Sequence, residues 1–430
     1  MREQTTRRLR EAGDGTPRSA TLVVVGAGLA GAALIRNLPS SLRRPGATLL
    51  IDKNDCYTFA PLLHEVAVGR IHPDSVLSEI PALSRNRCGF LHAGVTSLSP
   101  ETRTLHTSSG PVSYEYLVLA TGSAAASPPE GLVPHLQSFH TLDDALRLRN
   151  VLNDAWWTAV EPSNRQDFPG ALTVVIVGGG ATGVELSAEI AALFGYLRRR
   201  SRRSSLTPRI VLVEATDRLM GWLNPYFHDA AMKHLSRLGV EVRLGTFVEE
   251  ANPDGVRAGE EWIPAAMRLW TAGIEAAGPA ARSGMESDES GRVRVDEHLT
   301  VLDHPEVYIL GDAGIYADPR LGPLPPTGSL AVQQGPWTAR DLGRRLHGSK
   351  RRPPFRFSDR GYAVSLGPEN AIAEVLGTRI QGPAAQALYR GVLLYFLKNS
   401  RDRVLTGADW AMERTIGRLG FERPRERTES

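Results

Sequence analysis

The chain has 430 residues, enough for about two or three domains with sizeable cores. Hydrophobic residues make up 42% and charged residues 23%, as in a globular enzyme, and the 50 basic residues are nearly balanced by 47 acidic ones, which excludes a general nucleic-acid-binding role. Two cysteines, Cys56 and Cys88, cannot form a disulfide framework or a four-cysteine metal centre, and we expect no metal site.

The N-terminal stretch is polar and basic, and residues 1–20 predict a disordered arm. It lacks the apolar core of about 7–15 residues that a secretory signal needs. No part of the sequence reaches the roughly 18 apolar residues of a membrane-spanning helix. We therefore expect a cytoplasmic protein, and a peripheral contact with the inner face of the cell membrane stays open.

Residues 21–38 read as a strand, a glycine-rich turn and a helix, with Gly26, Gly28 and Gly31 in the turn. In this spacing the first glycine makes the tight turn, the second lets the backbone approach a pyrophosphate, and the third allows close packing of helix on strand. Asp52 ends the next strand, about 20 residues later, where an acid binds ribose hydroxyls. Together these features predict a dinucleotide-binding unit.

Two further elements follow this unit. Residues 104–122 predict a hairpin that leads into a buried strand, and residues 140–157 predict a helix for which Thr141 is a suitable cap. Turn-forming residues at 123–131 mark a crossover between the two halves of the chain.

A second strand, glycine turn and helix occupies residues 172–193 and contains Gly178, Gly180 and Gly183. Its first glycine follows Gly26 by about 150 residues, a domain-sized repeat rather than a solenoid period. The corresponding acid is Glu214, about 30 residues after Gly183 because a basic segment is inserted before the strand.

The second acid bears on coenzyme choice. Glu214 favours NADH over NADPH because a carboxylate repels a 2′-phosphate. Arg209 and Arg218 stand near it in the sequence and favour the opposite choice. Two dinucleotide sites in one chain suggest hydride transfer from a nicotinamide to a flavin, the usual two-electron partner, so FAD and NADH are the expected cofactors.

The C-terminal part contains a buried strand at 307–312, a helix at 329–346, a β segment at 353–377 and a helix at 384–398. We predict an α/β protein with two Rossmann-like dinucleotide-binding domains, the NAD domain inserted in the FAD domain, plus a C-terminal α+β region. The predicted FAD domain comprises 21–140 and 285–346, the NAD(P)H domain 141–284, and the C-terminal region 347–430.

Five short motifs appear in a fixed order: GAGLAG, ATG at Ala120–Gly122, GGGATGVE, TAGI at Thr271–Ile274 and YILGD at Tyr308–Asp312. This order resembles the FAD-dependent pyridine nucleotide-disulfide oxidoreductase superfamily. Within it the chain is most similar to the type II NADH:quinone oxidoreductases, over nearly its whole length. The resemblance implies transfer of hydride from NADH to FAD and then of two electrons to a quinone-type acceptor.

The resemblance also implies roles for particular residues. FAD contacts are expected from Ala120, Thr121, Gly122, Gly311 and Asp312, and nicotinamide-side contacts from Gly273. An acid after a buried strand also suits ribityl hydroxyls on physical grounds, although Asp312 as a helix cap is the alternative. The resemblance makes Glu185 of the GVE motif a candidate for handling protons, with a solvated acid in the first helical turn as the alternative. His64, from its position just after Pro61-Leu62-Leu63, is a second candidate, with a structural histidine as the alternative. The acceptor site is assigned to Pro61, Leu62, Gly328, Ser329, Gln333 and Gln334.

Two departures from the family concern the acceptor. Gly328-Ser329 replaces the usual Ala-Gln, which removes a hydrogen-bond partner for a quinone carbonyl. The C-terminal region also carries charged residues among its apolar ones: Lys398, Arg401, Asp402, Arg403, Asp409 and Glu413. Both features favour short-tailed over long-tailed quinones. Disulfide and sulfide:quinone reductases are disfavoured because Cys56 has no cysteine partner at short spacing.

Several alternatives stay open. The acceptor is either a quinone or a soluble quinonoid or other small molecule of specialised biosynthesis. A non-catalytic flavoprotein that senses NADH is the third reading. The C-terminal region serves the acceptor site, a homodimer interface or a membrane-surface contact.

Overall fold

The computed structural model describes residues 18–161, 170–201, 206–280, 283–397, 399–416 and 418–421, with side chains of 414–416 excepted. The chain forms two compact units. Unit 1 comprises the N-terminal residues to Tyr57, Glu79–Ser123 and Glu275–Phe357; unit 2 comprises Thr58–Ser78, Ala124–Ile274 and the residues from Ser358 onward.

Unit 1 is built on an eight-stranded sheet in the order β20-β21-β8-β1-β2-β5, with β6 and β7 joined to β8 as an antiparallel extension. Its strands are β1 (Arg18–Val25), β2 (Thr48–Asp52), β5 (Gly89–His92), β6 (Val95–Ser99), β7 (Thr104–Thr107), β8 (Gly110–Leu119), β20 (Thr300–Val301) and β21 (His304–Ile309). β1, β2, β5, β8 and β21 run parallel. The predicted hairpin and buried strand at 104–122 are confirmed.

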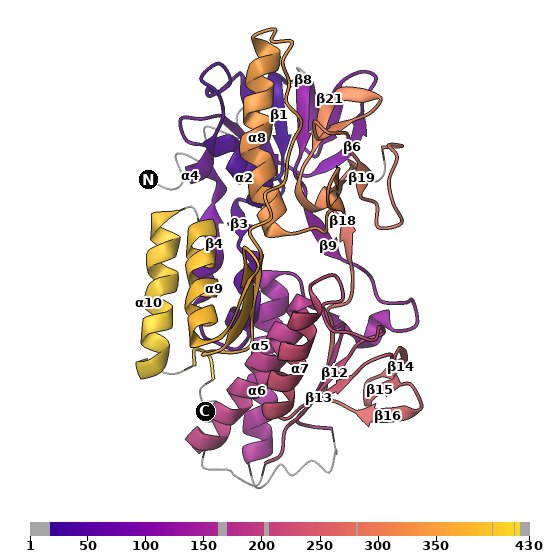
Figure 1. Ribbon diagram of the computed structural model, residues 1–430, viewed down its shortest axis with the longest axis vertical. Helices are drawn as coiled ribbons and strands as arrows, with labels where there is room; N and C mark the ends of the chain where they lie inside the picture. Colours follow the sequence, from indigo (N-terminus) through magenta and orange to yellow (C-terminus); the bar gives the residue numbers. More distant parts are fainter. Residues whose placement is uncertain are drawn as a thin grey trace, which may run out of the picture. The chain divides into compact units, whose positions relative to one another are not determined.

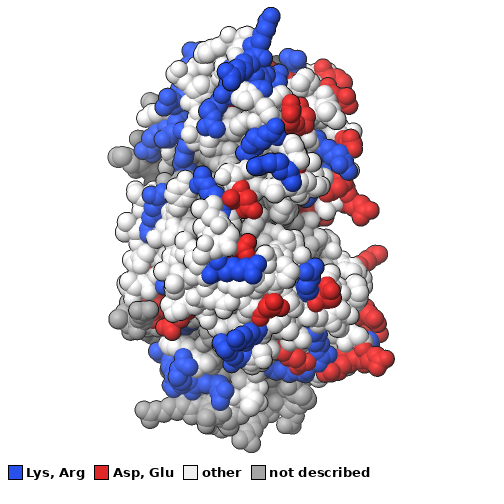
Figure 2. Space-filling model, in the orientation of Figure 1, with Lys and Arg blue, Asp and Glu red and all other residues white. Residues whose placement is uncertain are grey.

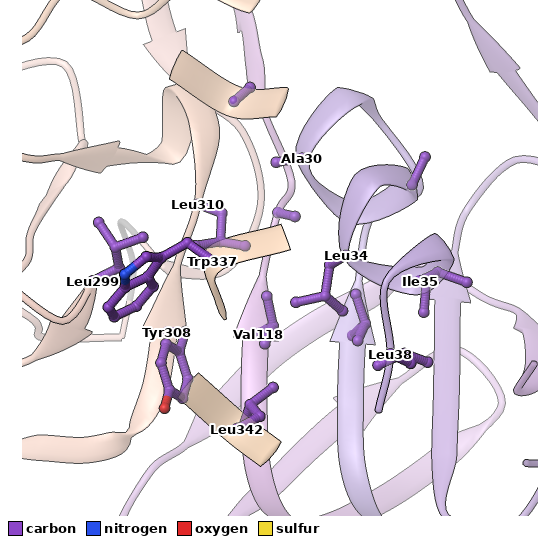
Figure 3. Packing of buried hydrophobic residues seen from close by; sticks show 14 of the residues in the cluster. Ala30, Leu34, Ile35, Leu38, Val118, Leu299, Tyr308, Leu310, Trp337 and Leu342 are labelled. Atoms are coloured by element: carbon purple, nitrogen blue, oxygen red, sulfur yellow. The ribbon is translucent and has the colours of Figure 1, made fainter. Parts of the chain in front are cut away.

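Both faces of β1 are buried, and alternate residues enter different cores, as the pleat of a strand requires. Leu22 and Val24 lie in the core beneath α2 (Leu29–Arg36) and α8 (Gly328–Leu346), whereas Val23 and Val25 lie in the core on the opposite face. Figure 3 shows the first core, with Leu34, Val118 and Leu342 converging from the helix, the sheet and α8.

Helix α8 lies directly against α2 because Gly335 presents no side chain there. A Cβ on Gly335 would lie 2.6 Å from the Ala30 carbonyl oxygen and 2.7 Å from the Leu34 nitrogen. The helix spans 328–346 as predicted, and its internal Pro336 is accommodated within it. Figure 2 shows charges of both signs on this face of the molecule, with Lys and Arg prominent over the upper part, where Figure 1 places α8. Arg344 and Arg345 in the last turn suit the negative end of the helix dipole.

Unit 2 is built on a five-stranded parallel sheet in the order β10-β17-β11-β12-β13. Its strands are β10 (Gln137–Ser138), β11 (Thr173–Val177), β12 (Arg209–Val213), β13 (Val240–Arg243) and β17 (Met267–Trp270). An antiparallel sheet of β14 (Val248–Asn252), β15 (Gly255–Ala258) and β16 (Glu261–Pro264) shares a core with Val175, Val177, Val211 and Val213. Helices α6 (Ala181–Ser201) and α7 (Pro225–Arg237) also contact the parallel sheet (Figure 1).

The remaining elements of unit 2 come from three separate parts of the chain. They are α3 (Leu63–Ala67), α5 (Leu142–Val160), the antiparallel strands β25 (Tyr362–Ser365), β26 (Ala371–Val375) and β27 (Thr378–Gly382), and the helices α9 (Pro383–Phe396) and α10 (Ser400–Ile416). Thr141 caps α5 as predicted, in a capping box with Asp144. The helix predicted at 384–398 is α9, whereas only the last part of the β segment predicted at 353–377 forms strands.

The α/β fold class is confirmed by the two parallel sheets and their covering helices. The N-terminal arm was predicted three residues too long, because Arg18 and Ser19 already pair with Val112 and Ser113. The rest of that predicted arm lies outside the described residues. Among the described residues, no helix is long and apolar enough to cross a membrane.

The boundaries of the two units differ from the predicted domain boundaries. Residues 58–78, expected in the FAD domain, and residues 358–430, expected as a separate region, both belong to unit 2. Buried ion pairs join these segments within unit 2, since Arg70 of the first segment bonds Glu189 of α6 and Glu413 of α10. Sequence patterns do not report such long-range pairings.

Candidate functional site

The first glycine turn joins β1 to α2. Gly26 has a φ of 96°, and a Cβ there would lie 2.3 Å from the Ala120 carbonyl oxygen. A Cβ on Gly31 would lie 1.9 Å from the Gly26 carbonyl oxygen, whereas one on Gly28 would meet no atom within 4 Å. Gly26 and Gly31 are therefore glycines because the protein itself fills their space. Gly28 faces open space at the uncapped start of α2, where unpaired N–H groups suit a pyrophosphate.

Asp52 closes the same turn from the end of β2. Its Oδ2 accepts a hydrogen bond from the Ala27 N–H at 2.8 Å, and its Oδ1 accepts one from the Asn54 N–H at 2.9 Å. These bonds fix the carboxylate beside the turn and leave further lone pairs for a donor such as a ribose hydroxyl. The residues of the first fingerprint are thus assembled in one place.

The other residues assigned to FAD lie in the same unit. The Ala120 N–H donates to Val25, and the Thr121 hydroxyl donates to the Ala277 carbonyl. Gly122 is in a left-handed conformation with φ 69°, as is Gly311 with φ 66°. The Ser123 hydroxyl donates to Asp312 Oδ2 at 2.8 Å. Asp312 begins no long helix, since its 3-10 turn is only three residues.

The second glycine turn joins β11 to α6 and repeats the first. Gly178 has a φ of 113°, a Cβ on Gly183 would lie 1.9 Å from the Gly178 carbonyl oxygen, and a Cβ on Gly180 would meet nothing within 4 Å. Glu214 Oε2 accepts from the Gly179 N–H at 2.6 Å. The Thr216 N–H and hydroxyl both donate to its Oε1.

The arginines near Glu214 in the sequence have other partners. Arg209 is bonded to Glu241, with its Nη2 at 2.8 Å from Oε2, and Arg218 pairs with Asp217 at 3.8 Å. The competing argument for NADPH is therefore weaker for Arg209 than its position in the sequence suggested. Gly273, with φ 75°, accepts a hydrogen bond from the Ala126 N–H at the end of this unit's sheet.

The first turns of α8, in unit 1, contain four of the residues assigned to the acceptor site: Gly328, Ser329, Gln333 and Gln334. A Cβ on Gly328 would lie 3.0 Å from Leu29 Cδ1, so the Leu29 side chain occupies the space of the missing methyl group. Gln333 Nε2 donates to the Ser329 carbonyl at 3.2 Å and lies 3.4 Å from its hydroxyl. Gln334 is buried, and its Oε1 accepts from the Gly311 N–H at 2.6 Å. This bond makes Gln334 a support for the Gly311 turn.

Pro61 and Leu62 lie in unit 2, in the 3-10 turn that leads into α3. His64 follows on α3 and is only 3% exposed. Its Nδ1 lies 3.6 Å from Glu185 Oε2, and its Nε2 is buried with no hydrogen-bond partner. A buried polar atom without a hydrogen-bond partner is costly, so Nε2 needs a partner that the protein does not supply. A bound molecule that hydrogen-bonds Nε2 would be such a partner.

Glu185 lies in the first turns of α6 and is held by two groups that the sequence gave no reason to single out. The Ser365 N–H and the Tyr389 hydroxyl both donate to its Oε1, each at 3.1 Å. Burial raises the pKa of Glu185, although His64 and these two donors act in the opposite direction. The carboxyl group therefore keeps its proton to a higher pH than an exposed glutamate.

Behind this pair lies a buried ionic cluster that centres on Arg70. The fully buried guanidinium bonds Glu189 and Glu413 and lies 3.4 Å from Glu65. Arg418 adds a second positive charge 3.7 Å from Glu189. Ligand atoms of His64, Glu65 and Glu189 come within 4.8 Å of one another, but Arg70 supplies the positive charge that a metal ion would bring.

The pKa values within the cluster reflect its crowding. Burial raises the pKa of Glu189 despite its arginine partners. Burial also acts to raise the pKa of Glu65, yet Arg70, His64 and the Trp410 N–H, which lies 2.6 Å from Glu65 Oε2, hold it below its usual value. One signal of the cluster was present in the sequence: Glu185 and Glu189 stand four residues apart in an apolar helix, and so share a face.

The three acids Asp402, Asp409 and Glu413 of α10 face inward. Asp402 bonds the Ser78 hydroxyl, Asp409 Oδ2 accepts from Ser75 Oγ at 2.6 Å, and Glu413 bonds Arg70. These acids stabilise the attachment of α10 to residues 58–78. On the outer side of the helix Val404 is 69% exposed, but Arg401 and Arg403 are exposed as well, so the acids predicted at the surface lie inside while two of the predicted basic residues lie outside.

Comparisons with known proteins agree with this arrangement. Residues 20–335 match the family described as pyridine nucleotide-disulphide oxidoreductase. The chain is 27% identical to a type II NADH:quinone oxidoreductase of Staphylococcus saprophyticus over 85% of this chain and 92% of the relative. It is 26% identical to the corresponding protein of Staphylococcus aureus over the same shares.

Solved structures share the fold. The structure of NDH2 from Plasmodium falciparum in complex with NADH superposes with a TM-score of 0.83 at 16% identity, over 95% of this chain and 100% of that one. The sulfide:quinone oxidoreductase of Aquifex aeolicus gives a TM-score of 0.74 at 18% identity, over 93% and 96%.

Proposed function

The chain belongs to the pyridine nucleotide-disulphide oxidoreductase family, and we propose that it is an FAD-dependent NADH dehydrogenase that passes two electrons to a quinone-type acceptor. One observation carries the proposal: two complete dinucleotide-binding turns in one chain, each with an acid bonded to the turn and an open space at its second glycine. The names of the Staphylococcus relatives support the choice of a quinone.

The residues of the first turn fit FAD. Open space at Gly28, the uncapped start of α2 and the fixed carboxylate of Asp52 suit the ADP part, and Asp312 suits the ribityl hydroxyls. When bound, FAD supplies two-electron chemistry that links a hydride donor to an acceptor. The corresponding residues of the second turn, with Glu214 as the acid, suit NADH.

The side chains near Glu185 would manage the proton. Oxidation of NADH by a quinone consumes one proton, since NADH, H⁺ and quinone give NAD⁺ and quinol. His64, with its unpaired buried Nε2 and with Nδ1 close to Glu185, is suited to deliver that proton, and Glu185 to replace it. Neither group forms a covalent bond to the substrate.

Disulfide chemistry has no support. A disulfide reductase needs two cysteines close enough to bond, and Cys56 and Cys88 are both free. Burial raises the pKa of both thiols, which further disfavours reactive thiolates.

An anaerobic experiment tests the proposal. The FAD-loaded protein should lose its flavin absorbance on addition of NADH and regain it on addition of a quinone. Binding of FAD and NADH without turnover with any acceptor would contradict the proposal and favour an NADH sensor. Rapid reoxidation by non-quinone compounds alone would favour a soluble biosynthetic acceptor.

The length of the quinone tail is a separate prediction. With the acids of α10 turned inward, the preference for short tails rests on Gly328-Ser329, where Gln333 already bonds Ser329, and on the exposed Arg401 and Arg403. Loss of one hydrogen bond costs about 1–1.5 kcal/mol, or roughly tenfold in affinity. We expect short-tailed quinones to have the higher kcat/KM in the presence of vesicles. A better long-tailed substrate, with protein sedimenting with the vesicles, would contradict this and support the predicted peripheral membrane contact.

A further inference from the structure

The two oxygens of Glu185 have different environments. Oε1 accepts hydrogen bonds from the Ser365 N–H of β25 and the Tyr389 hydroxyl of α9, each at 3.1 Å. Oε2 faces His64 Nδ1 at 3.6 Å. Two elements from the C-terminal part of unit 2 therefore fix one oxygen and direct the other toward α3.

Tyr389 serves as a hydrogen-bond donor only. Its side chain is 5% exposed, and burial together with the nearby Glu185 raises its pKa well above the usual value. It therefore keeps its own proton throughout the neutral pH range. Such a hydroxyl orients a carboxylate without taking part in its protonation.

The charges around the pair do not balance without one additional proton. The charged and titratable groups of the surrounding elements are His64, Glu65, Arg70, Glu185, Glu189, Arg390, Glu413 and Arg418. They comprise four carboxyl groups and three guanidinium groups. An excess of buried carboxylates favours one additional proton on an imidazole or a carboxyl group, and burial raises the pKa of both Glu185 and Glu189. His64 and Glu185 adjoin the unpaired Nε2 and are the pair best placed to share it.

We propose that Tyr389 is a positioning residue, which with the Ser365 N–H orients Glu185 so that its Oε2 exchanges one proton with His64. This inference rests on the proposed NADH:quinone reaction. His64 gives the proton from Nε2 to the acceptor, and Glu185 passes its proton to Nδ1. Before the next turnover Nε2 takes one proton from water and Nδ1 returns its proton to the Glu185 carboxylate, which restores both groups. The two electrons come from NADH, so each turnover takes one proton from solvent.

The test compares Tyr389→Phe with Tyr395→Phe, a control on the same helix whose ring is 57% exposed. Flavin reduction by NADH and reoxidation by quinone are followed separately by stopped flow across a range of pH. Tyr389→Phe should slow reoxidation roughly fivefold, the equivalent of one hydrogen bond, and leave reduction by NADH unchanged. Tyr395→Phe should leave both steps unchanged.

The pH profile distinguishes positioning from general damage. A proton donor works while protonated, so reoxidation should fall as pH rises through the pKa of Glu185, which burial raises. Removing the Tyr389 hydroxyl removes a donor that favours the carboxylate, so this decline should move to higher pH. In the Glu185→Gln background Tyr389→Phe should have no further effect. An unaltered rate and profile, or an equal loss in that background, would overturn the inference.

A spectroscopic measurement avoids dependence on the folding of the Tyr389→Phe variant. In the unmodified holoprotein, infrared difference spectra on quinone addition should contain a protonated-carboxyl band that is missing from Glu185→Gln. The lack of that band in an enzyme that turns over would overturn the inference alone. Failure of the holoprotein to oxidise NADH would instead overturn the proposed function, and this inference with it.

Discussion

The two glycine turns, one in each unit, have the same backbone geometry at the first glycine and the same hydrogen bonds to the acid. Gly26 and Gly178 have positive φ, and a Cβ on Gly31 or Gly183 would lie 1.9 Å from the carbonyl oxygen of the respective first glycine. In each turn the acid accepts from the residue after the first glycine and from the residue two positions after itself.

The turns differ at the residue after the first glycine. The first has Ala27, and the second has Gly179, where a Cβ would lie 2.6 Å from Leu219 Cδ2 and 2.9 Å from Glu214 Cβ. In the second turn the acid and Leu219 occupy the space that a methyl group fills in the first. The comparison teaches that some glycines serve the chain and others leave room for a ligand.

The largest effects are expected for Gly31→Ala and Gly183→Ala. The helix must move away from the strand, at about 3 kcal/mol or more, which is roughly a hundredfold in binding. Gly31→Ala should abolish FAD retention, whereas Gly183→Ala should stay yellow and lose reduction by NADH. Flavin content after purification and NADH titrations measure these outcomes. If Gly183→Ala lost FAD and Gly31→Ala kept it, the cofactor assignments of the two turns would be reversed.

Gly28→Ala and Gly180→Ala should separate stability from binding. Gly28 has a φ of −65°, which any residue adopts, and neither added methyl group would meet a protein atom. The free energy of unfolding of each apoprotein should therefore stay within about 1 kcal/mol of the parent's. Each variant should nevertheless bind the matching dinucleotide about tenfold more weakly, because the methyl group takes the space of the pyrophosphate. Thermal unfolding without cofactor and titration with it provide the two readouts. Equal losses in both would mean that these glycines also serve the fold.

Glu214→Gln tests the role of the acid in the second turn, and its expected effect is smaller than those of the glycine variants. The amide keeps the size of the side chain but removes the charge that repels a 2′-phosphate, so the ratio of kcat/KM for NADH over NADPH should narrow by roughly tenfold. Asp52→Asn, the matched change in the other turn, should weaken FAD binding and leave that ratio unchanged. A ratio that moves with Asp52→Asn but not with Glu214→Gln would place the coenzyme at the first turn.

Sequence patterns predicted these turns because everything that defines them is local. Three glycines, a strand, a helix and an acid lie within about 40 residues, and their spacing reflects the size of a pyrophosphate and a ribose. The two parallel sheets, the capping of α5 by Thr141 and the extent of α8 followed from equally local signals.

The buried cluster around Arg70 could not be predicted in the same way. Arg70, Glu189 and Glu413 come from three distant segments, and each alone resembles a surface charge. The same holds for Tyr389, whose hydroxyl meets Glu185 only after α9 has packed against the strands β25, β26 and β27. Asp402 and Asp409 were interpreted from the sequence as surface charges, whereas in the fold both point inward and accept hydrogen bonds from serine hydroxyls.

The smallest effect is expected for Ala27→Gly, which makes the first turn resemble the second. The Ala27 side chain is 1% exposed, and its methyl group belongs to the core beneath α2. Its loss should lower the free energy of unfolding by about 1 kcal/mol, because apolar burial is lost and the unfolded chain gains conformational freedom. The melting temperature should fall by roughly 2–4 °C. The N–H that bonds Asp52 at 2.8 Å is retained, so FAD affinity should change less than about twofold. Calorimetry of the apoprotein and FAD titration measure the two quantities. A large loss of FAD affinity would mean that the methyl group, and not only the N–H, positions Asp52, and the two turns would then hold their acids by different means.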